Sequence, residues 1–365
     1  MKIVKDVVSV PVIGVGRMND PALMLSALRT GAMDFVALGR ESVCDPHLPE
    51  KIKEGRLDEI LTCTGCMQRC LYPNSFEEGF GISCMINPFS GKEHIWEITP
   101  AEKKKKIAVV GAGPVGLQAA WILAKRGHEV KVYEKEITAG GQYRLAAVPA
   151  MKQELAKTIS TYLTFCKKYG AEVIYGVKAT KEMLEQEGFD EIILACGAQP
   201  LVPRIPGIDG ENVYLANQVL SFDVRLSGQK ILVLGAGLVG AEAAEVLSTY
   251  GNKVTVVDML DKAAPLAPLR PRENLLSRLD KAGVGFCLNS RVCEIRPDGI
   301  RYDQNGETKE MTGFDSIVLA FGSRSDKALE TEYEGDHRIH SVGDCLTAGD
   351  AKKGIYEATK LAMVL

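Results

Sequence analysis

The chain has 365 residues, of which 46% are apolar, and its 44 basic and 47 acidic side chains give a net charge of −3. This length predicts two or three compact domains, and the near-balanced charge excludes an electrostatic case for nucleic acid or an anionic membrane as a partner. No apolar run reaches the roughly 18 residues of a membrane span and no signal segment opens the chain, so we expect a soluble, cytoplasmic protein that acts on a small molecule.

The first elements along the chain are two short β-type runs, Val10–Val15 and Phe35–Leu38, on either side of a helical stretch, Pro21–Thr30. A glycine follows each run. This spacing predicts one β-α-β unit. Two strands alone would leave unpaired edges and an uncovered apolar face.

Four of the ten cysteines follow within 22 residues, in the pattern C-x2-C-x3-C-x13-C: Cys63, Cys66, Cys70 and Cys84. Without a secretory signal, clustered cysteines favour metal or redox use over disulfides. Four thiolates can hold a structural Zn²⁺ or a [4Fe–4S] cluster, and spacing alone does not separate the two. Three ligands crowded in one loop favour iron–sulfur, with zinc and an inert buried thiol network as the alternatives.

A repeat with an offset of 124 residues organises the rest of the chain. Ile107–Glu134 aligns without gaps on Ile231–Asp258, with 13 of 28 positions identical, and Asp190–Pro200 resembles Asp315–Asp326. Each long copy reads as a strand, a glycine turn, a helix and a second strand that ends in an acid, which predicts two similar nucleotide-binding domains. The charged stretch Glu102–Lys106 predicts a linker before the first of them.

Both copies contain the G-x-G-x-x-G pattern of dinucleotide-binding turns. The first glycine permits the tight turn, the second lets the backbone approach a pyrophosphate, and the third lets helix and strand pack closely. The acid that ends the next strand can bind the adenosine ribose. One such pattern can arise from packing alone, but two copies with their acids favour nucleotide binding. The residues are Gly111, Gly113, Gly116 and Glu134 in the first copy, and Gly235, Gly237, Gly240 and Asp258 in the second.

Asp258 bears on the choice between NADH and NADPH. A carboxylate at this position binds the 2′-hydroxyl of NADH and repels the 2′-phosphate of NADPH, so we expect NADH. Lys253 and Lys262 are close in the sequence, and they leave NADPH as the less favoured alternative.

From about Val7 onward the sequence resembles the C-terminal half of the 2,4-dienoyl-CoA reductase and trimethylamine dehydrogenase group of iron–sulfur flavoproteins, in the old yellow enzyme superfamily. The resemblance rests on both glycine turns, on the cysteine pattern and on further motifs. These are PVIGVGR at Pro11–Arg17, ALGRESVCDP at Ala37–Pro46, CTGCMQRC and SCMINP within Cys63–Pro88, Gly140-Gly141-Gln142, and Val342-Gly343-Asp344.

The resemblance implies an α/β chain that contains the remnant of an FMN-binding (β/α)8 barrel, an iron–sulfur loop and two Rossmann-like domains of the disulfide-reductase type, one inserted in the other. A complete barrel takes roughly 250 residues, so six of its strands are missing here. The implied segments are 1–60 for the barrel remnant, 61–102 for the four-cysteine loop and linker, 103–220 and 330–365 for the FAD-binding domain, and 221–329 for the NAD(P)H-binding domain.

The resemblance also assigns cofactor contacts that the residues alone leave as ordinary turns, loops or helix caps. The phosphate of FMN would be held by Gly16, Arg17, Gly39 and Arg40, two glycine-arginine pairs at the ends of barrel strands. FAD would be contacted by Gly141, Gln142, Val177 and Asp344 in addition to the first glycine turn. The cluster would be held by the four cysteines.

The implied activity passes electrons from NADH to FAD, to the [4Fe–4S] cluster and to FMN, and in the complete enzyme reduces an activated C=C bond of an enoyl-CoA or enoate. Three alternatives stay open: an amine dehydrogenase-like enzyme, an electron-transfer subunit resembling the small subunit of glutamate synthase, and a module that binds a nucleotide without turnover. The proton donor of this family lies on the missing strands, so no catalytic residue is assigned. The partners compatible with this reading are a chain that supplies the rest of the barrel and a second copy in a homo-oligomer.

Overall fold

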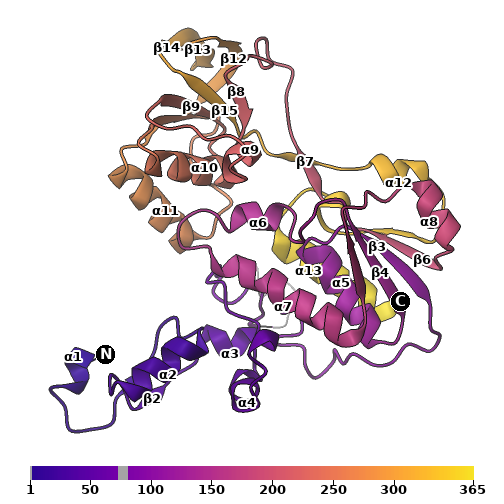
Figure 1. Cartoon of the computed structure of the whole chain (residues 1–365). Coiled ribbons are helices and arrows are strands. Elements are labelled where there is room, and N and C mark those ends of the chain that lie inside the picture. Colours follow the sequence, from indigo (N-terminus) through magenta and orange to yellow (C-terminus); the bar gives the residue numbers. More distant parts are fainter. Residues whose placement is uncertain (1, 73–80) are drawn as a thin grey trace. The chain divides into compact units, whose positions relative to one another are not determined.

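The computed structural model describes residues 2–72 and 81–365, which fall into two compact units (Figure 1). Unit 1 comprises Met1–Gly141, Glu154–Cys196 and Lys327–Leu365, and unit 2 comprises Gln142–Gln153 and Gly197–Asp326. Unit 2 is therefore an insertion in the chain of unit 1. Which nucleotide each unit binds stays a prediction, and so do the domain limits that depend on it.

Unit 1 begins with short elements around a small apolar cluster. They are α1 (Lys2–Lys5), β1 (Ile13–Gly14), α2 (Pro21–Arg29), β2 (Phe35–Val36), α3 (Arg40–Cys44), α4 (Leu48–Lys53) and η1 (Leu57–Glu59). The side chain of Asp20 caps α2 by accepting from Ala22 N, and β1 pairs with β2 in parallel. The predicted β-α-β unit is thus confirmed. Within the described part of the chain, β1 and β2 pair only with each other.

A five-stranded parallel sheet in the order β17-β6-β3-β4-β5 forms the centre of unit 1. Residues of β3 alternate between its faces, because Ala108 and Val110 join the apolar cluster that includes Leu184 of α8, while Val109 faces Gly116 of α5. The strands are β3 (Lys106–Val110), β4 (Glu129–Glu134), β5 (Glu172–Tyr175), β6 (Glu191–Leu194) and β17 (Ile339–Ser341). The helical segments are α5 (Pro114–Lys125), α7 (Glu154–Tyr169), α8 (Lys181–Glu187), α12 (Ala328–Glu332), η3 (Gly343–Cys345) and α13 (Ala351–Val364).

The predicted linker before β3 is only partly a linker. Lys106 is the first residue of β3, and the ammonium of Lys105 lies 2.7 Å from Glu191 at the start of β6. The prediction of a linker was therefore wrong at the C-terminal end of this stretch, because Lys106 belongs to β3 and Glu191 of the neighbouring strand pairs with Lys105.

Unit 2 repeats the same sheet pattern, with the parallel order β11-β10-β9-β15-β8. In both units the strand before the glycine turn lies between its own β-α-β partner and a later strand, which confirms the structural repeat that the sequence predicts. The elements of the parallel sheet layer are β8 (Val213–Leu215), β9 (Lys230–Leu234), β10 (Lys253–Val257), β11 (Gly285–Cys287) and β15 (Ser316–Leu319), with helices α6 (Gln142–Ala146), α9 (Ala216–Leu220), α10 (Leu238–Thr249) and α11 (Leu269–Lys281). The antiparallel strands are β12 (Ser290–Arg296), β13 (Gly299–Gln304) and β14 (Glu307–Thr312) in one sheet, and β7 (Ala198–Pro200) with β16 (Ser323–Ser325) in another.

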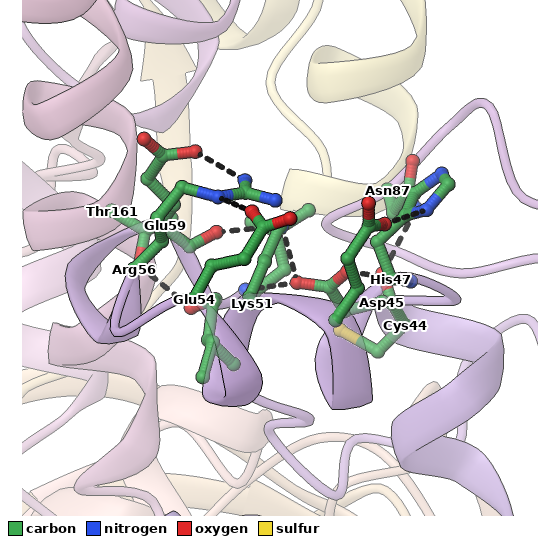
Figure 2. Close-up of polar contacts among 12 residues, drawn as sticks. Cys44, Asp45, His47, Lys51, Glu54, Arg56, Glu59, Asn87 and Thr161 are labelled. Carbon is green, nitrogen blue, oxygen red and sulfur yellow. Dashed lines mark hydrogen bonds and ion pairs between the residues drawn. The ribbon is translucent and has the colours of Figure 1, made fainter.

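A buried ion pair organises the segment that leads into the cysteine loop (Figure 2). Lys51 Nζ lies 2.6 Å from Asp45 Oδ2 and donates to Glu59 O at 2.8 Å, and Asp45 Oδ2 also accepts from Leu61 N at 2.9 Å. Thr161 of α7 donates to Ile60 O at 3.0 Å. These bonds fix the backbone directly before Cys63 against α7.

No helix among the described residues combines the length and the apolar character that crossing a membrane requires.

We expect Lys51→Met to lower the free energy of unfolding of unit 1 by about 3 kcal/mol, because it leaves the buried Asp45 carboxylate without its cation. Lys2→Met, at the exposed Lys2–Asp6 pair, is the control and should change it by less than about 0.5 kcal/mol. Denaturant unfolding followed by tryptophan fluorescence measures both, since Trp96 and Trp121 line the same cavity of about 470 Å³ as Asp45 and Lys51. Equal midpoints for the two variants would contradict the structural role of the buried pair.

Candidate functional site

Each glycine turn lies where the carboxyl ends of two neighbouring parallel strands meet. Gly111 follows β3, and a Cβ on it would lie 2.4 Å from Ala195 O, directly after β6. Gly235 follows β9, and a Cβ on it would lie 2.3 Å from Ala320 O, directly after β15. Only glycine permits this approach. In each sheet the chain continues from the central strand, β3 or β9, to one side and later returns to the other side of that strand. Open α/β sheets bind their ligands at such a switch point.

The second and third glycines of each turn have different surroundings. A Cβ on Gly116 would lie 2.0 Å from Gly111 O, and one on Gly240 would lie 1.9 Å from Gly235 O, so these glycines are required for packing. A Cβ on Gly113 or Gly237 would meet no heavy atom of the described chain within 4 Å. No described residue covers this side of the second glycine. A helix, α5 or α10, begins at the next residue. The cradle therefore fits a pyrophosphate at a helix N-terminus.

The acids at the ends of β4 and β10 hold the turns in place. Glu134 accepts from Ala112 N at 2.8 Å and from Glu136 N at 2.9 Å. Asp258 accepts from Ala236 N in the same way, and from Leu260 N at 2.8 Å. The sequence pattern alone does not indicate this role. A carboxylate oxygen has two lone pairs, so each acid can still accept from a ribose hydroxyl.

Other expected FAD contacts of unit 1 gather at the first turn. Val177 N donates to Glu134 O at 2.9 Å, and Gly140 N donates to Ala112 O at 2.8 Å. A Cβ on Gly141 would lie 3.9 Å from the Cα of Gly113. Residues from three separate chain segments thus surround one glycine turn.

Asp344 belongs to η3, which packs against the first turn of α5. A Cβ on Gly343 would lie 3.0 Å from a methyl group of Val115 in α5. Burial raises the pKa of the Asp344 carboxyl, and the charges of Asp350 and Glu357 act in the same direction. Asp344 is not the cap of α13, because Asp350 accepts from Lys353 N at 2.9 Å and fills that role.

Two expectations for the nucleotide residues need qualification. Gln142 lies in unit 2, where its side-chain amide donates to Ala198 O at 2.6 Å. Lys253 is the first residue of β10 and Asp258 follows its last, so five residues of extended chain separate them by roughly 16 Å. Lys253 is therefore too distant to offset the charge of Asp258, so the sequence expectation was wrong for Lys253, and for Lys262 it stays a prediction.

The four clustered cysteines share one partly buried region. Burial raises the pKa of the Cys63 thiol to about 11 and that of Cys66 to about 12, and it also raises the pKa of Cys70. The charge of Cys84 acts on all three in the same direction, which places the thiols in one another's electric field. Among the described residues, no three His, Cys, Asp or Glu side chains are arranged as ligands of a single metal ion. Part of the spacer between Cys70 and Cys84, residues 73–80, lies outside the described residues.

A fifth cysteine touches this region. Cys44, at the end of α3, is fully buried and donates a hydrogen bond to Cys84, which lowers the pKa of the Cys84 thiol. The side chain of Asn87 in turn donates to Cys44 O at 2.8 Å (Figure 2). No local sequence pattern identifies this contact, because Cys44 and Cys84 are 40 positions apart.

The arginines of the two glycine-arginine pairs differ in their hydrogen-bond partners. A Cβ on Gly16 or Gly39 would meet no heavy atom of the described residues within 4 Å, and the Arg40 Nη1 atom is buried without a hydrogen-bond partner among them. A buried guanidinium nitrogen with an unused donor fits an anion. Arg17, in contrast, is bound to Glu154 of α7. Arg40 is thus open to a phosphate, whereas Arg17 already has an acid partner.

Comparison with known proteins gives two family matches. Residues 105–343 match the model described as pyridine nucleotide-disulphide oxidoreductase, and residues 1–59 match the NADH:flavin oxidoreductase / NADH oxidase family. The chain is 34% identical to NADH oxidase of Thermoanaerobacter brockii, over 95% of this chain and 55% of that protein. It is 33% identical to cinnamate reductase of Clostridium sporogenes, over 99% of this chain and 54% of that protein.

A solved structure resembles the whole chain. The complex of 2-naphthoyl-CoA reductase with 2-naphthoyl-CoA superposes with a TM-score of 0.92 at 30% identity, covering 99% of this chain and 55% of the reductase. The chain thus spans about half the length of the relatives it matches.

We expect Gly113→Ala and Gly116→Ala to have different effects. Gly113 has φ −71° and open space at its Cβ position, so alanine there should leave the free energy of unfolding nearly unchanged. The affinity for FAD should fall roughly tenfold, because the methyl group occupies the pyrophosphate cradle. Gly116→Ala should lower the free energy of unfolding by about 2 kcal/mol, because its methyl group overlaps Gly111 O. Denaturant unfolding and flavin titration of the apoprotein separate the two. Unchanged flavin affinity in Gly113→Ala would argue against the cradle.

Proposed function

Because this chain belongs to the pyridine nucleotide-disulphide oxidoreductase family, and corresponds to the C-terminal portion of NADH:flavin oxidoreductases like 2,4-dienoyl-CoA reductase, we propose that it binds FAD in unit 1 and NADH in unit 2 and supplies electrons to a reductive reaction. The observation that carries the proposal is the open cradle at Gly113 and Gly237, each beside an acid that ends the next strand.

In unit 1 the chain's residues bind and orient FAD. The amides at the start of α5 donate to the pyrophosphate across Gly113, and Glu134 accepts from the adenosine ribose. Val177 lies beside Glu134, where it can contact the adenine. Asp344 and Gly141 border the same turn, and Gln142 follows directly in the chain. The assignments for Val177, Gly141, Gln142 and Asp344 rest on the family pattern.

In unit 2 the corresponding turn, Gly235, Gly237 and Gly240, binds the pyrophosphate of NADH, and Asp258 accepts from the ribose 2′-hydroxyl. The carboxylate of Asp258 repels the extra phosphate of NADPH. Since Lys253 lies at the far end of β10, it leaves this repulsion intact. NADH is therefore the proposed electron donor.

Cys63, Cys66, Cys70 and Cys84 are the proposed ligands of a [4Fe–4S] cluster, and Gly16, Arg17, Gly39 and Arg40 the proposed contacts of the FMN phosphate. The donor set suits iron–sulfur chemistry because four thiols share one partly buried region, where the charge of the Arg40 guanidinium acts on Cys63 and Cys70. Arg17 would have to exchange Glu154 for the phosphate. When bound, these groups would supply the redox chemistry, which is two-electron uptake from NADH and electron transfer toward the substrate.

The proposed substrate class is a small molecule with an activated C=C bond, as the names of cinnamate reductase and 2-naphthoyl-CoA reductase suggest for those relatives. Substrate contacts and the proton donor would come from barrel strands beyond the two described here. The exposed apolar side chains of this region, such as Ile13, Val15 and Phe35, suit packing against such strands. A chain that supplies the rest of the barrel, or a homo-oligomer, is the proposed assembly.

The absorption spectrum of the anaerobically purified chain tests this function. We expect flavin bands over a broad iron–sulfur shoulder, and both should bleach on addition of stoichiometric NADH. Steady NADH oxidation with an artificial acceptor would exclude a module that binds without turnover. A preparation that takes up no flavin, or whose four cysteines hold only zinc, would refute the electron-transfer role.

Asp258→Asn tests the nucleotide choice. The amide keeps one acceptor for the turn but removes the negative charge, so the affinity for NADH should fall roughly tenfold and the preference over NADPH should narrow. Asp261→Asn, which removes an exposed acid three residues away, is the matched control and should leave both affinities unchanged. Fluorescence titration with each nucleotide measures the ratio of the affinity for NADH to that for NADPH. An unaltered ratio in Asp258→Asn would contradict the proposed ribose contact.

A further inference from the structure

Two cysteines outside the four-cysteine loop come together at the edge of the sheet in unit 1. Cys196 follows β6, and Cys345 ends η3, which follows β17. The two strands are parallel neighbours with Ser341 opposite Leu194, and Val342 N donates to Leu194 O at 3.0 Å. This pairing brings two thiols together that are 149 positions apart in the sequence.

The surroundings of the pair are apolar. Cys345 is 1% exposed and belongs to a buried cluster with Leu184 and Tyr333, against which the partly exposed Cys196 packs. The Cys196 thiol donates a hydrogen bond to Cys345, which lowers the pKa of the Cys345 thiol. Both residues are thiols rather than members of a disulfide in the structure. An accessible thiol thus lies directly beside a buried one.

Two charged groups act on the pair, Glu330 within helix α12 and Lys327 directly before that helix. Glu330 raises the pKa of Cys345 and Lys327 lowers it, and the two side chains form an ion pair with each other. Their opposing effects leave the hydrogen bond from Cys196 as the largest influence on Cys345.

The pair lies at the carboxyl edge of the sheet, next to the first glycine turn. The backbone nitrogen of Cys196 is 3.5 Å from the position of a Cβ on Gly111, and Cys345 directly follows Asp344. A bond between the two sulfurs would tie the end of β6 to the segment that contains Asp344. The oxidation state of the pair would therefore act on a segment that borders the dinucleotide site.

We propose that Cys196 and Cys345 form a redox-active thiol pair, in which a hydroperoxide oxidises the accessible Cys196 and the buried Cys345 completes a disulfide. The inference does not require FAD, NADH or the cluster to be bound.

The proposed reaction is balanced. Peroxide transfers one oxygen to the Cys196 sulfur, giving a sulfenic acid and one molecule of water. The Cys345 sulfur then attacks the Cys196 sulfur, so that an S–S bond forms while the S–O bond breaks and a second water leaves. The thiol pair loses two electrons, the peroxide gains them, and both thiol protons end in water. A small thiol such as dithiothreitol reverses the reaction by exchange.

The test uses the full chain, purified anaerobically and treated briefly with hydrogen peroxide. After catalase and alkylation, peptide mass spectrometry should show one cross-linked peptide pair that joins Cys196 to Cys345, with a mass about 2 Da below that of the two free thiol peptides. Dithiothreitol before alkylation should restore both thiols.

Single substitutions distinguish the cysteine that peroxide oxidises from the cysteine that completes the disulfide. Cys196→Ser should abolish the cross-link, whereas Cys345→Ser should leave a sulfenic acid at Cys196 that dimedone traps. If Cys345→Ser does not fold, Cys345→Ala removes the thiol without adding a buried hydroxyl. Cys293→Ser, at an exposed thiol of unit 2, and Cys166→Ser, at a buried thiol of α7, are controls that should retain the cross-link.

Two results would overturn the proposal. One is full alkylation of Cys196 and Cys345 after peroxide treatment that oxidises the exposed Cys293. The other is a Cys196 that forms disulfides with other cysteines as readily as with Cys345. Circular dichroism of each variant shows whether a lost cross-link reflects a lost thiol or a lost fold.

Discussion

The close approach of backbone segments at the glycine turns is the constraint on which both units depend. At Gly111 and at Gly235 the carbonyl oxygen that follows the neighbouring strand lies within 2.4 Å of the position that a Cβ would take. Any side chain there would separate the two central strands and open the sheet at its switch point. The same approach creates the proposed ligand site, because it turns the chain sharply and directs the amides of the following helix toward the open side of the second glycine.

The acids at the ends of β4 and β10 connect this constraint to function. Each holds its glycine turn through a backbone amide and is also the group expected to bind a ribose. Stability and nucleotide binding are therefore linked at these positions, and a substitution that removes the acceptor oxygens should affect both.

The remaining site residues lie close together for reasons of non-local packing. Sequence patterns correctly indicated the first β-α-β unit, the repeat and the steric roles of the first and third glycines, since each depends on local spacing and on simple sterics. They did not indicate that Arg17 pairs with Glu154, that Cys44 bonds to Cys84 or that Lys105 pairs with Glu191. Each of these partners lies 40 or more positions away, and no local pattern identifies it.

The sequence by itself determined where the turns, their acids and the clustered cysteines lie, because backbone sterics and period-two or helical spacing act locally. Only the tertiary structure decided that Asp45 and Lys51 anchor the segment before the cysteine loop, that Lys253 is remote from Asp258, and that Cys196 meets Cys345. Strand pairing decides the last of these relations. In a parallel sheet, residues more than a hundred positions apart become neighbours through the order of the strands, which the spacing of residues along the chain does not specify.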